Sequence, residues 1–238
     1  LETRYPDFPG LNLSWEVREG IIKHCSAFDQ PDVSDYDAAK RVSLEGQVVN
    51  LADELAYNCH DLEDGLRSGI LEFDGLAEVK LWRIAYEAIE GQNLSPEFLR
   101  HQSVRFLKDY LVKDALKQSW ENIKAAGINS SEDARLLDHN LISFSHETHG
   151  LIRELSKYLL DNFYFNHRVI RMTTKAKWLI EDLFRRYVET QKLLPEKIQR
   201  NIAAGQVAQR VICDYIAGMT DRFALDEYSK LTDPNTRV

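Results

Sequence analysis

The stretch LEGQVVNLADELAYNCHDLEDG, residues 44–65, has the pattern of a two-sided α-helix. At about 100° per residue, its polar side chains fall in one stripe along the helix. The stripe consists of Asp53, Tyr57, His60, Asp61 and Asp64. The opposite side carries Val48, Leu51, Ala52, Leu55, Cys59, Leu62 and Leu66. We therefore predict a helix over residues 43–67 whose apolar side packs in a core.

The polar stripe has two interpretations. A polar face opposite an apolar one is the usual pattern of a solvated helix. However, three carboxylates at nearby positions repel one another slightly, and no Lys or Arg lies between them. A bound cation would relieve this repulsion, and carboxylate oxygens beside an imidazole suit Mg²⁺ or Mn²⁺. The stripe is either a solvated acidic face or one wall of a ligand site.

The rest of the chain is also predicted to be helical. Gly and Pro are scarce, at 11 and 6 residues, and no alternating strand pattern bounded by hairpin turns occurs. Helical periodicity predicts further helices over residues 15–24, 76–89, 96–125, 133–145, 151–163, 169–190, 195–203 and 207–223. We expect an all-α bundle built by helix packing.

Composition excludes several classes of protein. The net charge of −8 argues against duplex nucleic acid as a partner, because phosphate binding needs a basic surface. No apolar run reaches the roughly 18 residues of a membrane span. Cys25, Cys59 and Cys213 are far apart, so we expect neither a thiolate zinc site nor a disulfide framework, and a reduced cytoplasmic setting. Because the chain begins at Leu1 rather than Met, we expect it to be part of a longer protein.

Four blocks of sequence resemble the bacterial dGTPase family, the deoxyguanosinetriphosphate triphosphohydrolase-like proteins of the HD superfamily. They are WEVREGIIKH (15–24), LEGQVVNLADELAYNCHDLED (44–64), NHRVIRM (166–172) and DYIAGMTDRFA (214–224). The blocks occur in the family's order and span nearly the whole chain. The resemblance implies an HD-domain-type helical bundle, with residues 1–238 forming its C-terminal part.

The resemblance also implies a metal site. Family members hold a divalent metal, Mg²⁺ or Mn²⁺, with a His, a His-Asp pair and a distant Asp. Asp53 matches the distant Asp, whereas the His and the His-Asp pair would lie upstream of this sequence. We therefore expect this chain alone to be inactive. The dipeptide His60-Asp61, with His24 lying 36 residues earlier, is an alternative metal set, but the family pattern places that dipeptide two turns beyond the ligand.

Four further residues are candidates for substrate contact. By the family match, Tyr57 and Asp61 face the substrate one and two turns beyond Asp53. Arg168 would bind phosphate, which suits a guanidinium, or lie on a solvated helix start. Tyr164 would stack on a base or sugar, or simply pack.

The implied reaction converts a dNTP, dGTP or another, to a deoxynucleoside and inorganic triphosphate. The implied assembly is a homo-oligomer such as a hexamer. The alternative is a non-catalytic regulatory or scaffold protein that kept the HD-type fold.

Overall fold

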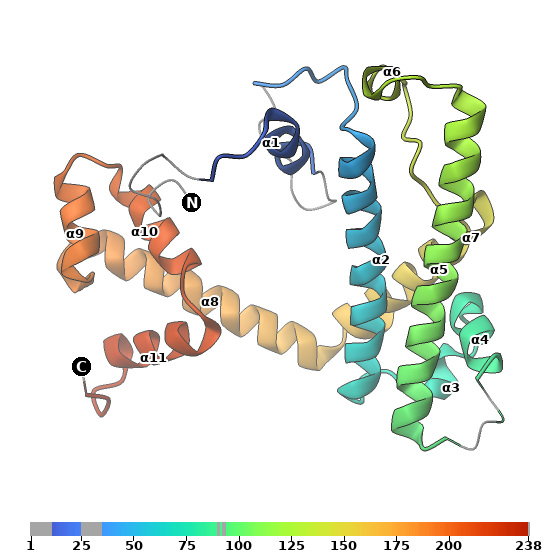
Figure 1. Cartoon of the computed structure of the whole chain (residues 1–238). Coiled ribbons are helices and arrows are strands. Elements are labelled where there is room, and N and C mark those ends of the chain that lie inside the picture. Colours follow the sequence, from blue (N-terminus) through green and yellow to red (C-terminus); the bar gives the residue numbers. More distant parts are fainter. Residues whose placement is uncertain (1–10, 25–34, 90, 92–93, 238) are drawn as a thin grey trace. The chain divides into compact units, whose positions relative to one another are not determined.

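The computed structural model describes residues 11–24, 35–89, 91 and 94–237, and within these ranges it contains helices and connecting segments but no strand (Figure 1). The all-α prediction is confirmed. None of the helices in the described ranges has both the length and the apolar character needed to cross a membrane. The chain divides into two compact units, Leu1–Phe163 and Tyr164–Val238.

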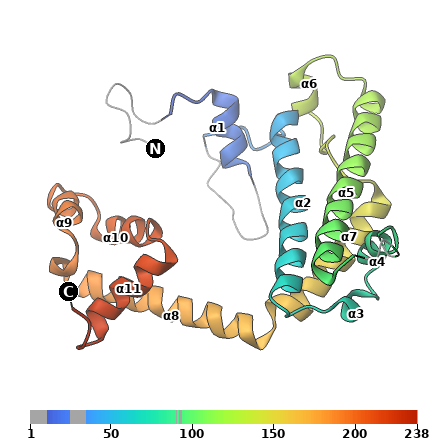
Figure 2. The same ribbon diagram turned by 60° about the horizontal axis from the view of Figure 1, so that its bottom comes forward.

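The first unit is built around two long helices, α2 and α5, which run side by side in opposite directions (Figure 2). α4 packs on both α5 and α7. The elements are α1 (Trp15–Ile22), α2 (Leu44–Arg67), α3 (Phe73–Leu76), α4 (Lys80–Glu87), α5 (Pro96–Ala126), α6 (Ser131–Arg135), α7 (His146–Leu159) and the π-helical turn η1 (Leu160–Tyr164), whose last residue already belongs to the second unit. The core between them is made mainly of leucines, including Leu62, Leu76, Leu81, Leu107, Leu111, Leu141, Leu155 and Leu159.

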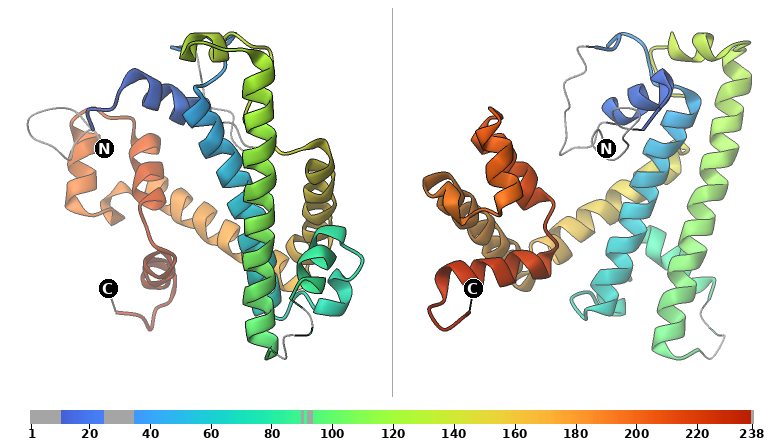
Figure 3. Two further views of the ribbon diagram at one scale, coloured as in Figure 1. Left: turned by 45° about the vertical axis from the view of Figure 1, so that its right-hand side comes forward. Right: turned by 60° about the vertical axis from the view of Figure 1, so that its left-hand side comes forward.

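In the second unit, α10 and α11 pack on the long helix α8 (Figure 3). Its elements are α8 (His167–Glu189), the short 3₁₀ turn η2 (Gln191–Leu193), α9 (Glu196–Ala203), α10 (Ala208–Ala217) and α11 (Asp221–Thr232). A separate core holds Leu179, Leu183, Tyr187, Leu194 and Ile212. The hydroxyl of Tyr187 donates to the carboxylate of Glu227 on α11 at 3.1 Å, which satisfies the polar end of a buried ring.

The ends of the two long helices follow their capping residues. α2 begins after Ser43, whose hydroxyl oxygen accepts from the backbone N–H of Gly46 at 3.3 Å. α5 begins after Ser95 with Pro96 in its first turn, and ends at Gly127 in the left-handed conformation, φ 60°. The predicted boundaries of both helices are confirmed to within one residue.

The prediction of one helix over residues 133–145 is wrong. α6 stops early, and residues 136–145 follow an irregular path. Their backbone groups are bound by side chains of the long helices: Gln47 Oε1 accepts from the N–H of Leu141 (2.8 Å) and Ile142 (3.2 Å). Ser119 Oγ likewise accepts from the N–H of Ser143 at 3.1 Å. These bonds replace the ladder that a helix would need.

Two other predicted helices are each split in two. Residues 76–89 contain the end of α3 and all of α4, and residues 207–223 contain α10 and the start of α11. In the second case the Thr220 hydroxyl accepts from the N–H of Phe223 and starts a new helix. Gly150 lies inside α7, which begins five residues before the predicted start at residue 151.

The buried side of α2 differs in part from the predicted one. Cys59 and Leu62 are fully buried, as expected, but Val48 is 50% exposed. Ala52 is also exposed, and Leu55 is only partly buried. In their place α2 buries two polar side chains, Gln47 and Asn58. The buried side of α2 therefore includes polar side chains as well as apolar ones, and it is rotated about the helix axis away from Val48 and Ala52.

Candidate functional site

A groove of about 820 Å³ lies along the middle of α2 in the first unit. Its walls come from the end of α1, residues 38–42, α2, residues 140–144 and α7. Asp53 and Tyr57, one helical turn apart, both line it. Two of the predicted site residues therefore share one groove, while Asp61 lies a further turn along α2 and is not part of the lining.

Asp53 presents an open carboxylate to this groove. Its side chain is 65% exposed, and its Oδ2 lies 3.5 Å from Nε2 of His24. Nδ1 of His24 in turn forms a short hydrogen bond with Oδ1 of Asn50. A carboxylate and an imidazole thus lie side by side in the groove, and an exposed carboxylate is a ligand type that suits a divalent cation.

The described residues do not complete such a site. Within the described ranges, no group of three or more His, Cys, Asp or Glu side chains could hold a metal ion. The alternative set of His24, His60 and Asp61 is therefore not assembled. His24 instead contacts Asn50 and Asp53, about three and two turns before that dipeptide on α2.

Two other polar groups of the stripe, Asp61 and Tyr57, are partly desolvated. Burial raises the pKa of Asp61, and the nearby Asp64 carboxylate adds to this, while His60 opposes it. Burial also raises the pKa of Tyr57, with a smaller contribution from Asp61. Tyr57 therefore stays a neutral hydrogen-bond donor at physiological pH, and Asp61 is costly to ionise.

Asp61→Asn is expected to raise the thermal unfolding midpoint at neutral pH. The raised pKa of Asp61 means that the folded state loses stability as the pH rises above the unfolded pKa of about 3.9 and through the folded one. The amide does not ionise, so the difference from the wild type should be larger at about pH 7.5 than at about pH 4. Melting curves at both pH values test this, and an equal difference at both would contradict it.

Buried polar side chains fix the groove walls. Besides its bonds to residues 141 and 142, the Gln47 amide donates to the carbonyl of Val42 at 3.1 Å. Asn58 Oδ1 accepts from the hydroxyl of Ser156 on α7 at 2.7 Å. Sequence reasoning did not single out these contacts. The available indication was the position of Gln47 and Asn58 on a helix side that otherwise packs apolar residues.

A buried carboxylate, Glu19, holds α1 in place and was also missed. Both of its oxygens accept from Nη2 of Arg135 at 2.8 Å, and Oε1 accepts from Nζ of Lys23 at 2.8 Å. The guanidinium of Arg135 also lies over the ring of Trp15, 4.9 Å from its centroid. This network joins α1 to α6 beside the groove.

Tyr164 and Arg168 belong to the second unit. Tyr164 is the last residue of η1 and is half-buried. Arg168 lies exposed in the first turn of α8, where its backbone N–H donates to Oδ1 of Asn166 at 3.0 Å. An arginine in a helix first turn lies beside N–H groups that themselves favour anions.

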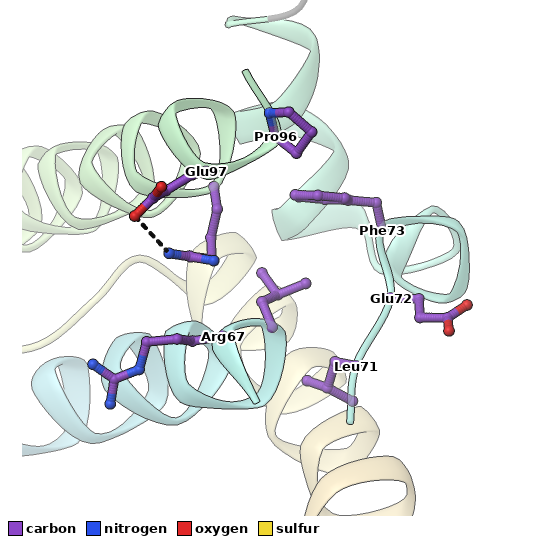
Figure 4. Close-up of a pocket in the computed structure, with 8 residues that line it drawn as sticks. Arg67, Leu71, Glu72, Phe73, Pro96 and Glu97 are labelled. Atoms are coloured by element: carbon purple, nitrogen blue, oxygen red, sulfur yellow. Dashed lines mark ion pairs between the residues drawn. The ribbon is translucent and has the colours of Figure 1, made fainter. Parts of the chain in front are cut away.

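A second pocket, of about 620 Å³, lies where α2 ends and α5 begins (Figure 4). Leu71, Phe73 and Pro96 line it together with charged side chains of both signs, and Glu97 pairs with Arg100 at 4.0 Å. Arg67, which lines it, comes 14 residues after Asp53 and so lies about 20 Å from it along the helix. None of the predicted site residues lines this pocket, and its mixed charges favour no ligand class.

The sequence matches known proteins over its whole length. It is 43% identical to a deoxyguanosinetriphosphate triphosphohydrolase-like protein of Geobacter metallireducens over 243 aligned residues, which cover all of this chain and 63% of that relative. Proteins of the same description from Geobacter sulfurreducens and Ralstonia nicotianae are 42% and 38% identical, with 63% and 60% of their length covered. The chain thus spans somewhat under two thirds of these relatives.

A family model agrees with these matches. Residues 142–230 match the model described as a phosphohydrolase-associated domain. The four blocks quoted above lie within the region aligned to the Geobacter metallireducens relative, since the alignment covers the entire chain. Over its whole length the chain is therefore similar to deoxyguanosinetriphosphate triphosphohydrolase-like proteins, of which it spans 60–63%.

Proposed function

We propose that the full-length protein hydrolyses a deoxynucleoside triphosphate, dGTP or another dNTP, to the deoxynucleoside and inorganic triphosphate. The observation that carries the proposal is that Asp53 and Tyr57 line one groove in a chain 43% identical, over all its residues, to a triphosphohydrolase-like protein. Water would attack the α-phosphorus, and the bond to the 5′-oxygen of the nucleoside would break.

Asp53 supplies one ligand of a divalent cation, Mg²⁺ or Mn²⁺. Such a cation activates water and offsets phosphate charge when it is bound. We assign the other ligands, a His and a His-Asp pair, to the part of the relatives' length that this chain does not span. The 238-residue chain alone is then expected to bind Mn²⁺ poorly and to hydrolyse no dNTP.

The remaining candidates would hold the substrate. Tyr57 positions a phosphate or the sugar by its hydroxyl, and Asp61 lies near the 3′-hydroxyl of the deoxyribose. Arg168 offsets charge on the triphosphate, and Tyr164 stacks on the base or sugar. Positioning of this kind supplies much of the rate in phosphoryl transfer. We further propose that the protein works in the cytoplasm as a homo-oligomer.

The proposal is tested with the full-length protein, Mn²⁺ and each of the four dNTPs in separate reactions. We expect inorganic triphosphate and deoxynucleoside in equal amounts, without pyrophosphate or orthophosphate. Unchanged dNTP in every reaction would instead favour the alternative, a regulatory or scaffold protein that kept the HD-type fold.

Arg168→Ala in the full-length protein is expected to slow dNTP hydrolysis about tenfold or more. A charge-assisted hydrogen bond to phosphate is worth roughly 1.5–3 kcal/mol, and the alanine variant loses it. Arg185→Ala is the matched control, because Arg185 is an exposed arginine of the same helix that pairs with Asp182. Initial rates and melting temperatures of both variants should be compared. Unchanged rates for Arg168→Ala would remove this residue from the phosphate site.

A further inference from the structure

His24 contacts the proposed metal ligand although it lies 29 residues earlier in the chain. Asn50 and Asp53 are three residues apart on α2 and so share one face of the helix. The imidazole lies between them, with Nδ1 bonded to Asn50 and Nε2 3.5 Å from the Asp53 carboxylate. The ring is therefore held at one nitrogen and directed to Asp53 with the other.

The surroundings of His24 keep this ring in place. Its side chain is 36% exposed, against 65% for Asp53, so the imidazole is the better-covered partner of the pair. A solvated surface histidine would be free to change rotamer, whereas this one is fixed by Asn50 and by the groove wall that it helps to form.

The backbone at His24 is fixed through the residue before it. Nζ of Lys23 donates to Glu19 (2.8 Å) and to the backbone carbonyls of Asp37 (2.7 Å) and Lys40 (2.9 Å), so all three ammonium protons are used. Glu19 is fully buried and accepts the two further bonds from Arg135. A buried ionic network in which every member is paired holds one geometry strictly.

We propose that His24 is a positioning residue that orients the Asp53 carboxylate for cation binding, and that the Glu19–Lys23–Arg135 network keeps His24 in register. This inference rests on the proposed function. Side chains that orient a ligating group are a regular part of metal sites, and removing one typically weakens metal binding or activity by about 10–100-fold.

The test measures Mn²⁺ affinity of the full-length protein from the electron paramagnetic resonance signal of free Mn²⁺. We expect His24→Ala to weaken binding by about 10–100-fold with little change in melting temperature. His24→Gln should recover part of the affinity, because its side-chain amide is polar and its N–H can donate to Asp53. His139→Ala is the control: His139 pairs with the exposed Asp138 at 2.6 Å but lies outside the groove, so Mn²⁺ affinity should not change.

Glu19→Gln tests the second part of the proposal. It keeps the shape of the side chain but removes the buried charge, so it should lower the melting temperature and weaken Mn²⁺ binding together. Both outcomes below apply when the wild type releases triphosphate. Unchanged Mn²⁺ affinity in His24→Ala would then overturn the proposed role of His24. Unchanged Mn²⁺ affinity in Glu19→Gln would overturn the proposed role of the Glu19–Lys23–Arg135 network. A wild type that neither binds Mn²⁺ nor hydrolyses dNTP would instead overturn the proposed function.

Discussion

Asp53→Ala in the full-length protein is expected to abolish triphosphate release while leaving the fold intact. A catalytic metal supplies several kcal/mol of transition-state stabilisation, so losing its ligand should lower the rate by about a thousandfold or more. Stability should change by less than about 0.5 kcal/mol, because the side chain is mostly exposed and its ion pair with His24 is solvated. Released inorganic triphosphate and thermal unfolding are measured on the same preparation.

The matched control for Asp53→Ala is Asp64→Ala. Asp64 lies three turns further along the same polar stripe and pairs with Arg67 at 3.0 Å, outside the groove. Asp64→Ala removes the same single charge from α2 as Asp53→Ala. If the loss of charge alone does not affect catalysis, triphosphate release by Asp64→Ala should stay within about twofold of the wild-type rate. Near wild-type turnover in Asp53→Ala would refute the alignment of this helix with the family's metal ligand.

The helices that could be predicted from sequence are those whose ends are encoded locally. Ser43 and Ser95 cap α2 and α5, and Gly127 ends α5. The capping residues and the helical periodicity therefore predict the same boundaries for these two helices. The segment 136–145 could not be predicted in this way. Its backbone is bound by Gln47 and Ser119, which lie far away in sequence and become partners only once the helices have packed.

The residues of the candidate site likewise differ in whether the local sequence predicts their position. Asp53 and Tyr57 are four residues apart on one helix, so the periodicity alone places both on the same face. The approach of His24 to Asp53 depends instead on where α1 packs, and α1 is held by the buried Glu19 and its partner Arg135, 116 residues apart. Local sequence therefore indicates the α2 wall of the groove and not the residues that face it.

Leu62→Ala is expected to cost about 2–5 kcal/mol of unfolding free energy, the usual range for a leucine truncated in a core. Leu62 has no exposed surface, and it lies on the side of α2 that packs against its neighbours. The folded fraction should keep its activity, because Leu62 is not among the residues that line the groove. Urea unfolding gives the free energy, and triphosphate release per folded molecule gives the activity.

Leu55→Ala on the same helix distinguishes the observed orientation of α2 from the one predicted by its sequence. The sequence pattern places Leu55 and Leu62 on one apolar side and so predicts similar losses. In the structure Leu55 is only partly buried, and its truncation should cost about 1 kcal/mol, because less apolar surface returns to water. Equal losses of unfolding free energy in the two variants would mean that α2 buries the side carrying Val48 and Ala52, as the sequence pattern predicts. Asp53 would then point away from the groove.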